Sequence, residues 1–69
     1  MLISARNQLR GTVTNVSKGA SIANVELDVA GNRIVASITV EAVEELRLSK
    51  GDPVIAIIKA SDVMIATED

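Results

Sequence analysis

Three kinds of residue are missing from this sequence of 69 residues: cysteine, histidine and the aromatic residues. Without cysteine the chain forms no disulfide and no thiolate metal site. Without histidine it also lacks the commonest zinc ligand and the usual general base. The serines have no imidazole to activate them as nucleophiles. We therefore expect a protein that is not an enzyme, with a core built from aliphatic side chains.

Two pairs of adjacent carboxylates, Glu44-Glu45 and Glu68-Asp69, offer the remaining acid–base chemistry. Adjacent residues on a helix point in different directions, so the first pair is expected to be a solvated surface. The second pair is expected to be a frayed tail. Neither pair changes the expectation that the chain lacks catalytic activity.

Positive charge is also scarce. Seven Lys and Arg residues against nine Asp and Glu residues give a net charge of −2. Nucleic-acid binders usually carry a basic face, and those that bind single strands use stacking aromatics. No apolar run approaches the ~20 residues of a membrane-spanning helix, and no signal-peptide pattern begins the chain. We expect a cytoplasmic protein that binds neither nucleic acid nor membranes.

Aliphatic residues are abundant for so short a chain, in which 48% of residues are hydrophobic. A domain of this size buries only about 60% of the surface that its unfolded chain exposes. Small scaffolds without disulfides or metals often gain stability by oligomerisation. We infer that part of the apolar surface is buried between subunits of a homo-oligomer.

Alternating apolar and polar residues predict strands in the first half of the chain. The stretch ANVELDV, residues 23–29, alternates strictly and predicts a strand with one buried face. Gly31-Asn32 is a tight-turn signal, and residues 34–40 are predicted to return as a second strand. Residues 8–17 are rich in β-formers, but their alternation changes phase, which predicts a bulge near Thr14-Asn15. Within that strand, Gly11 predicts a bend or a close backbone approach.

Helical spacing replaces the alternation near residue 40. Val40, Val43 and Leu46 predict a short helix, with Thr39 as its N-cap and Gly51 as its left-handed stop. Residues 54–60 predict a strand buried on both faces, whose outer side needs a cover that another subunit could supply. Residues 63–67 predict a last short strand. This order predicts an all-β domain with one short helix over residues 1–69, an OB-fold-like five-stranded Greek-key barrel.

Several polar residues are suited to binding a tetrahedral oxyanion, which needs many hydrogen-bond donors and positive charge. Ser4 and Arg6 lie on the same side of an extended segment. Lys59 ends an apolar strand, where it either extends into solvent or meets an anion. Thr39 lies at the start of the predicted helix, where free N–H groups favour anions. Taken singly, each has a simpler interpretation as a surface charge, a helix cap or an edge-strand residue.

Three long stretches closely resemble the molbindin, or Mop, family: SARNQLRGTV (4–13), VSKGA (16–20) and VEELRLSKGDPVIAIIKASDVMIAT (43–67). The resemblance covers nearly the whole chain. It implies a cytoplasmic protein that binds and stores or buffers molybdate or tungstate, without an organic cofactor. It also implies a homohexamer built as a trimer of dimers. A purely structural module, in which the polar residues serve only assembly, remains the alternative.

The resemblance also implies which residues bind the oxyanion. The family's site lies at a subunit interface and corresponds here to Ser4, Arg6, Thr39, Lys59, Ala60 and Ser61. Family hexamers also hold oxyanions near the three-fold axis, which corresponds to Lys18, Gly19, Ala20 and Ser21. That stretch is otherwise an ordinary hairpin turn.

Two further expectations follow from the resemblance. Related domains carry a serine three residues after the threonine, and Ala42 stands there in this chain, so one donor is missing. The family's N-terminal strand pairs across the dimer. Leu2 and Ile3 are therefore expected to be buried against a second subunit, carrying Ser4 and Arg6 into a site that the other subunit's Lys59 or Thr39 completes.

Overall fold

The computed structural model describes residues 1–68, so Asp69, the last residue of the C-terminal carboxylate pair, lies outside it. The elements, in chain order, are β1 (Asn7–Lys18), β2 (Ile22–Val29), β3 (Asn32–Thr39), α1 (Val40–Leu46), β4 (Pro53–Ile58) and a 3-10 turn (Ala60–Asp62). The predicted strands over residues 8–17, 23–29, 34–40 and 54–60 are therefore confirmed to within two residues at each end. No helix in residues 1–68 is long and apolar enough to cross a membrane.

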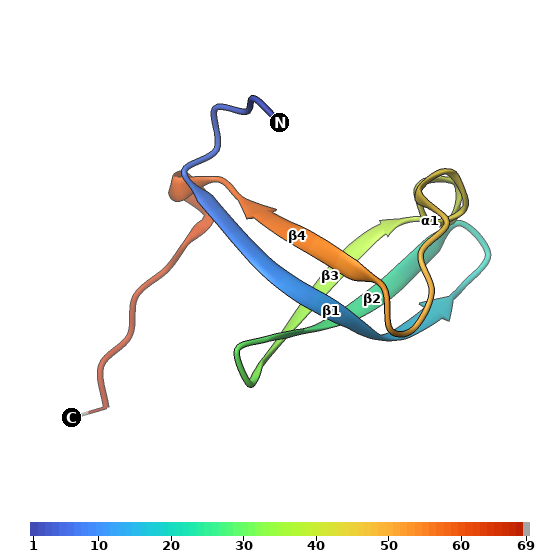
Figure 1. Cartoon of the computed structure of the whole chain (residues 1–69). Helices are drawn as coiled ribbons and strands as arrows, with labels where there is room; N and C mark the ends of the chain where they lie inside the picture. The colour runs from blue at the N-terminus through green and yellow to red at the C-terminus, as the bar shows by residue number, and fades with distance from the viewer. Residues whose placement is uncertain (69) are drawn as a thin grey trace.

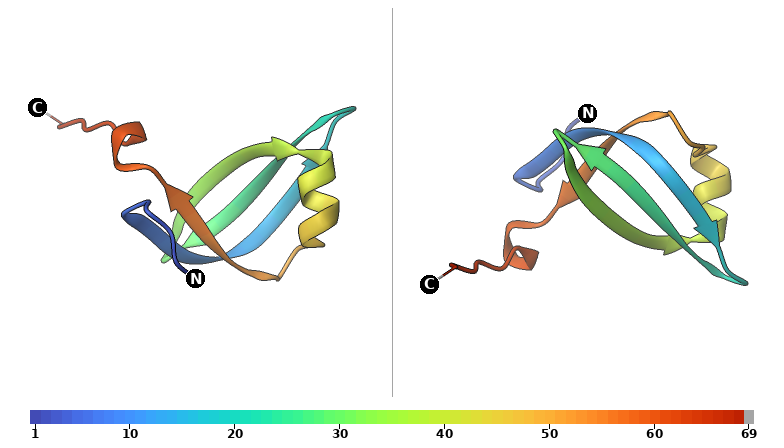
Figure 2. Two further views of the ribbon diagram at one scale, coloured as in Figure 1. Left: turned by 90° about the horizontal axis from the view of Figure 1, so that it is seen from above. Right: turned by 90° about the horizontal axis from the view of Figure 1, so that it is seen from below.

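The four strands form one antiparallel sheet in the order β3-β2-β1-β4. The sheet is strongly curved, and α1 lies at one end of it, between the end of β3 and the start of β4 (Figures 1 and 2). Strands β3 and β4 are the two edges of the sheet. The described residues therefore form a curved sheet that is not closed into a barrel.

The fifth strand predicted over residues 63–67 is absent from this structure. Residues 63–68 form neither helix nor strand, and the segment extends away from the sheet (Figure 1). Val63, Met64 and Ile65 are 45%, 92% and 87% exposed. A strand is held by the hydrogen bonds of a neighbouring strand, and the sheet within residues 1–68 places this segment beside neither edge.

The hairpin between β2 and β3 turns one residue earlier than the sequence signal predicts. Val29 pairs with Asn32, so the two turn residues are Ala30 and Gly31. Their φ angles of 50° and 86° place both in the left-handed region, as in the turns that match the twist of a tight hairpin. Asn32 begins β3, and its Nδ2 donates to the carbonyl oxygen of Val29 at 3.3 Å.

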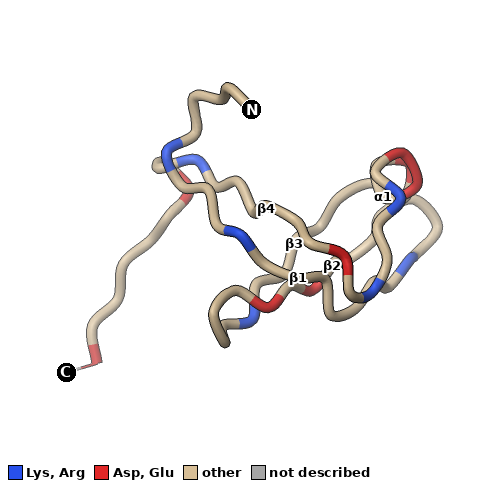
Figure 3. Tube along the Cα trace, in the orientation of Figure 1, with Lys and Arg blue, Asp and Glu red and all other residues tan. Residues whose placement is uncertain are grey.

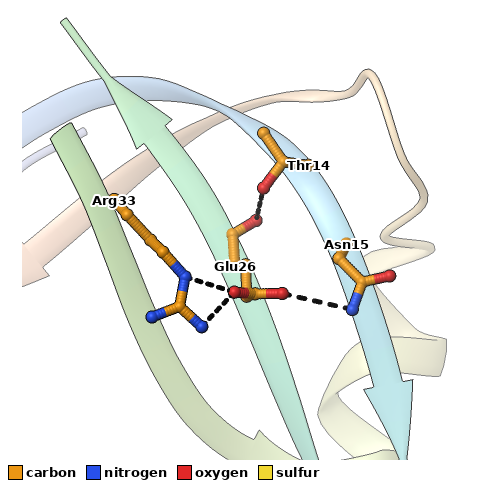
Figure 4. Close-up of polar contacts among 4 residues, drawn as sticks. All are labelled: Thr14, Asn15, Glu26 and Arg33. Atoms are coloured by element: carbon orange, nitrogen blue, oxygen red, sulfur yellow. Dashed lines mark hydrogen bonds and ion pairs between the residues drawn. The ribbon is translucent and has the colours of Figure 1, made fainter. Parts of the chain in front are cut away.

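The bulge predicted in the first strand is confirmed. The register of β1 against β2 shifts between Val13 and Asn15. Glu26 of β2 fixes both bulge residues: its carbonyl oxygen accepts from Thr14 Oγ1 at 3.1 Å, and its carboxylate accepts from Asn15 Nδ2 at 3.3 Å. Arg33 of β3 forms an ion pair with the same carboxylate (Figure 4). One side chain therefore joins three strands at the bend.

The core lies on the concave face of the sheet, where inward side chains of β1 and β2 meet one residue of α1. The buried residues are Val13, Ala23, Val25, Leu27 and Val43. All five are aliphatic, as the composition requires. Because α1 contributes Val43, the helix closes one end of the core.

Strand β4 is not buried on both faces in this chain, contrary to the prediction. Val54, Ala56 and Ile58 are half-buried, whereas Ile55 and Ile57 are 36% and 41% exposed. No segment within residues 1–68 covers the outer face of β4. The apolar residues on that face are therefore open to solvent in the single chain.

Helix α1 ends earlier than predicted, at Leu46, and its left-handed stop is Arg47 rather than Gly51. Arg47 has a φ of 53°, which lets the N–H of Leu48 donate to the carbonyl oxygen of Val43 at 3.1 Å. Leu48 then packs against the core. Gly51 is left-handed too, with a φ of 96°, but it belongs to the turn that enters β4. Burial of Leu48 explains why the helix stops before the glycine.

Candidate oxyanion site

The first group of predicted site residues lies where β1 begins and β4 ends. Asn7 pairs with Ile58, so Arg6 and Lys59 extend from neighbouring strands at the same end of the sheet (Figure 3). Ser4 precedes Arg6 on the N-terminal segment. Both cations are exposed, and neither forms an ion pair within residues 1–68. Two free positive charges therefore stand side by side at this end.

Two further predicted residues adjoin the lysine. Ala60 and Ser61 form the start of the 3-10 turn, whose backbone is closed by the N–H of Asp62, which donates to the carbonyl oxygen of Lys59 at 2.9 Å. The turn holds Lys59 at the edge of the sheet. Ser61 is exposed, so its hydroxyl is open to solvent.

The second group of predicted residues lies at the opposite end of the sheet. Ile22 pairs with Thr39, and the N–H of Val40 donates to the carbonyl oxygen of Ser21 at 2.9 Å. The turn between β1 and β2 thereby adjoins the start of α1. A hollow of about 420 Å³ at this place is lined by Ala20, Ser21, Thr39, Val40, Glu41 and Glu44. Lys18 and Gly19 complete the turn on the other side of Ala20.

One chain does not bring the two groups together. Strand β1 has twelve residues, and a strand of that length spans up to about 40 Å. The longest dimension of the chain is 39 Å. Arg6 precedes one end of β1, and Lys18 stands at the other. Within one molecule, Ser4, Arg6 and Lys59 therefore form one half of the predicted site, and Thr39 with the turn at residues 18–21 forms another.

Thr39 caps the helix, as predicted. Its Oγ1 accepts from the N–H of Ala42 at 3.0 Å. Ala42 supplies its backbone N–H to the cap and, as an alanine, offers no hydroxyl. The hydroxyl of Thr39 retains its own O–H as a donor toward the hollow.

Replacing Thr39 with alanine is expected to lower the free energy of unfolding by about 1 kcal/mol, because the N–H of Ala42 loses its acceptor. Thr39→Ser keeps the hydroxyl and is the matched control. Chemical denaturation of both variants tests this expectation. A stability of Thr39→Ala equal to that of Thr39→Ser would show that the cap contributes nothing.

Two carboxylates lie beside Thr39. Glu41 and Glu44 line the same hollow, and both are exposed, as predicted for Glu44 in the solvated pair with Glu45. Their spacing of three residues on a helix places them on one face. Within residues 1–68 no cluster of three or more carboxylates, histidines or cysteines is suited to a metal cation.

A larger apolar groove of about 790 Å³ runs between the two edge strands. Its lining is apolar apart from Ser37. It includes consecutive residues of β3 and of β4, together with Leu46 and Leu48. Such a lining offers an oxyanion almost no donors. The groove is instead open apolar surface, and its lining includes the exposed Ile55 and Ile57 of β4.

Comparison with known proteins shows what the chain resembles. The family model described as the TOBE domain matches residues 3–65. Molybdenum-pterin-binding protein 1 of Clostridium pasteurianum is 48% identical over 66 residues, which cover 94% of this chain and 97% of the relative.

Two solved structures share the fold. The molybdate-binding protein from Sporomusa ovata superimposes with a TM-score of 0.93 at 39% identity, covering 97% of this chain and 100% of that one. The cytoplasmic molybdate-binding protein ModG, in a form with molybdate bound, gives a TM-score of 0.84 at 39% identity. That match covers 87% of this chain and 43% of ModG.

Proposed function

This chain belongs to the TOBE domain family and, within it, to the molbindin or Mop proteins, and from that premise we propose that it binds molybdate between copies of itself. The relatives are named for binding rather than for catalysis. The placement of the site residues supports the proposal most directly. Ser4, Arg6 and Lys59 stand at one end of the chain, and Thr39 stands at the other.

A shared site follows from that separation. In the proposed arrangement, the Arg6 end of one copy meets the Thr39 end of a second copy. Hydroxyl, guanidinium and ammonium groups then surround one tetrahedral dianion, with Ala60 and Ser61 beside the ammonium of Lys59. Each hydrogen bond to a charged group contributes about 1.5–3 kcal/mol, and micromolar binding requires about 8 kcal/mol. Several such donors therefore suffice.

Exposed apolar surface supports assembly. Leu2 is fully exposed in the single chain, and Ile3 is 42% exposed. Ile55 and Ile57 on the outer face of β4 and the segment from Val63 to Ile65 are exposed as well. Contiguous exposed apolar patches of this kind mark interaction surfaces. We propose that other copies cover them in a homohexamer, a trimer of dimers. A fifth strand at residues 63–67, and a closed Greek-key barrel, then form only within that assembly.

The same site is proposed to accept tungstate. Molybdate and tungstate are tetrahedral dianions of similar size, so donors that respond to shape and charge do not separate them. We propose a role in storing or buffering these oxyanions in the cytoplasm. The turn at residues 18–21 is proposed as a second oxyanion site near the three-fold axis, with backbone N–H groups as its main donors.

Calorimetric titration of the purified protein with molybdate, tungstate, sulfate and phosphate tests the proposal. We expect saturable binding of the first two, with a stoichiometry that requires more than one chain per site. Equilibrium sedimentation of the same sample is expected to show an oligomer. A monomer at micromolar concentration that releases no heat with molybdate would overturn the proposal and leave a structural module as the explanation.

A further inference from the structure

The segment that carries Ser4 and Arg6 lies outside the sheet. Strand β1 begins at Asn7, and residues 1–6 bend at Ser4 and again at Arg6, so the segment turns away from the direction of β1 (Figure 1). Neither a helix nor a strand of the described chain includes these two proposed donors. Their orientation must therefore come from contacts other than the sheet.

Apart from the ladder of the sheet, one hydrogen bond within residues 1–68 holds this segment. Gln8 Nε2 donates to the carbonyl oxygen of Ala5 at 3.1 Å. A carbonyl oxygen only accepts, so the group that meets it must be the amide NH2 of the glutamine. Gln8 itself pairs with Ile57 of β4, which fixes its backbone in the sheet. The side chain thereby connects the N-terminal segment to a fixed strand.

The carbonyl that accepts this bond lies between the two proposed donors. Ala5 stands between Ser4 and Arg6, and its carbonyl belongs to the planar peptide unit that leads into Arg6. Holding that oxygen limits the rotation of the peptide plane, and with it the directions in which the backbone presents the side chains on either side. Ala5 is half-buried, whereas both neighbours are exposed. The bond therefore restricts the backbone and leaves both side chains free to donate.

We propose that Gln8 is a positioning residue for the oxyanion site, because its bond to Ala5 holds Ser4 and Arg6 in the orientation in which they donate. The inference rests on the proposed function, in which those two side chains bind molybdate. A site that is already ordered loses less conformational entropy when the ligand binds, so its affinity is higher. Without the amide, the anion must order the segment as it binds, and the Kd rises.

Gln8→Met tests the inference, because methionine has a similar length and no charge but donates no hydrogen bond. The matched control is Thr12→Val, which removes an exposed polar group of the same strand that forms no side-chain hydrogen bond within residues 1–68. Calorimetric titration with molybdate is expected to give a Kd about two- to tenfold higher for Gln8→Met, the effect of one neutral hydrogen bond, and an unchanged Kd for Thr12→Val. The melting temperature of Gln8→Met without oxyanion is expected to equal that of the wild type, because residues 1–6 contribute nothing to the buried core.

Two further measurements separate positioning from direct contact with the anion. Because Gln8 is proposed to act through Ser4 and Arg6, Gln8→Met is expected to raise the Kd less in an Arg6→Ala background than in the wild type. A glutamine that contacts the anion itself would raise the Kd by the same factor in both backgrounds. Nuclear magnetic resonance relaxation of the backbone, without oxyanion, is expected to show greater motion of residues 4–6 in Gln8→Met than in Thr12→Val.

Three results would overturn the inference: a Kd of Gln8→Met equal to that of the wild type, an equal rise of the Kd in both backgrounds, or unchanged motion of residues 4–6. A wild type that binds no molybdate would instead count against the proposed function. The relaxation measurement would then still show whether Gln8 holds the segment. The two failures are therefore distinguishable.

Discussion

Replacing Arg6 with alanine is expected to weaken molybdate binding by about 10- to 150-fold. The estimate corresponds to the loss of one hydrogen bond to a charged group, worth about 1.5–3 kcal/mol. Arg6 is exposed and forms no ion pair within residues 1–68, so its removal is expected to leave the fold of the single chain intact. Calorimetric titration of the folded variant measures the loss.

Two control substitutions separate a local contact from a general effect of charge. Arg10 is an exposed arginine of β1, four residues after Arg6, and it pairs with Ile55 outside the proposed site. Arg10→Ala is expected to change the Kd less than threefold, as expected for a distant charge that salt screens. Lys18→Ala belongs to the other proposed site and is expected to cost far less than Arg6→Ala. Equal losses for all three variants would mean that the site is elsewhere.

The conservative variant Arg6→Lys tests whether binding depends on the geometry of the hydrogen bonds that Arg6 donates as well as on its charge. Lysine retains the charge but not the planar fork that donates two parallel hydrogen bonds to an oxyanion. We expect an intermediate loss of affinity. Full retention would show that Arg6 acts only as a point charge.

Local signals in the sequence predicted local structure well. The strict alternation at residues 23–29, the phase change at Thr14-Asn15 and the hydroxyl at Thr39 each depend on a few neighbouring residues, and all three were confirmed. The end of the helix depends instead on tertiary packing. Gly51 carries the stronger local stop signal, yet Arg47 adopts the left-handed conformation because Leu48 packs on the core.

The prediction of a strand over residues 63–67 was wrong for a different reason. Its side chains have the composition of a strand, but a strand also needs a neighbour, and the neighbour is not supplied within the described chain. The outer face of β4 shows the same limit, since Ile55 and Ile57 have the pattern of buried residues and remain exposed. An apolar pattern shows which side chains can be buried, but the exposure of each one depends on whether another segment covers it, and no segment within residues 1–68 does so here.

The candidate site could be predicted as a set of residues but not as an arrangement. The resemblance implies that Arg6 and Thr39 belong to one site, and the sheet register shows that they stand at opposite ends of the chain. The hollow beside Thr39 depends on how α1 meets the turn before β2, and no local sequence signal predicts that contact.

Gly11→Ala is expected to cause a large loss of stability, about 3 kcal/mol. A Cβ atom at this position would lie 2.6 Å from the carbonyl oxygen of Asp28 and 2.8 Å from Cγ2 of Val29. The valine methyl can rotate away, but the carbonyl belongs to the backbone of β2, so the strands must separate. Overpacking of this kind costs about 1–3 kcal/mol, and a backbone clash belongs at the upper end. For a domain of this length, the melting temperature is expected to fall by about 10–20 °C.

Gly31→Ala separates the clash from the general cost of replacing a glycine. Gly31 has a φ of 86°, but a Cβ there would meet no atom within 4 Å. Its replacement is expected to cost about 1 kcal/mol through backbone strain alone. Both variants are compared by thermal unfolding at one protein concentration, because the proposed assembly would make the melting temperature depend on concentration. If Gly11→Ala proved no less stable than Gly31→Ala, the close approach of β1 to β2 at Asp28 would not constrain the sheet.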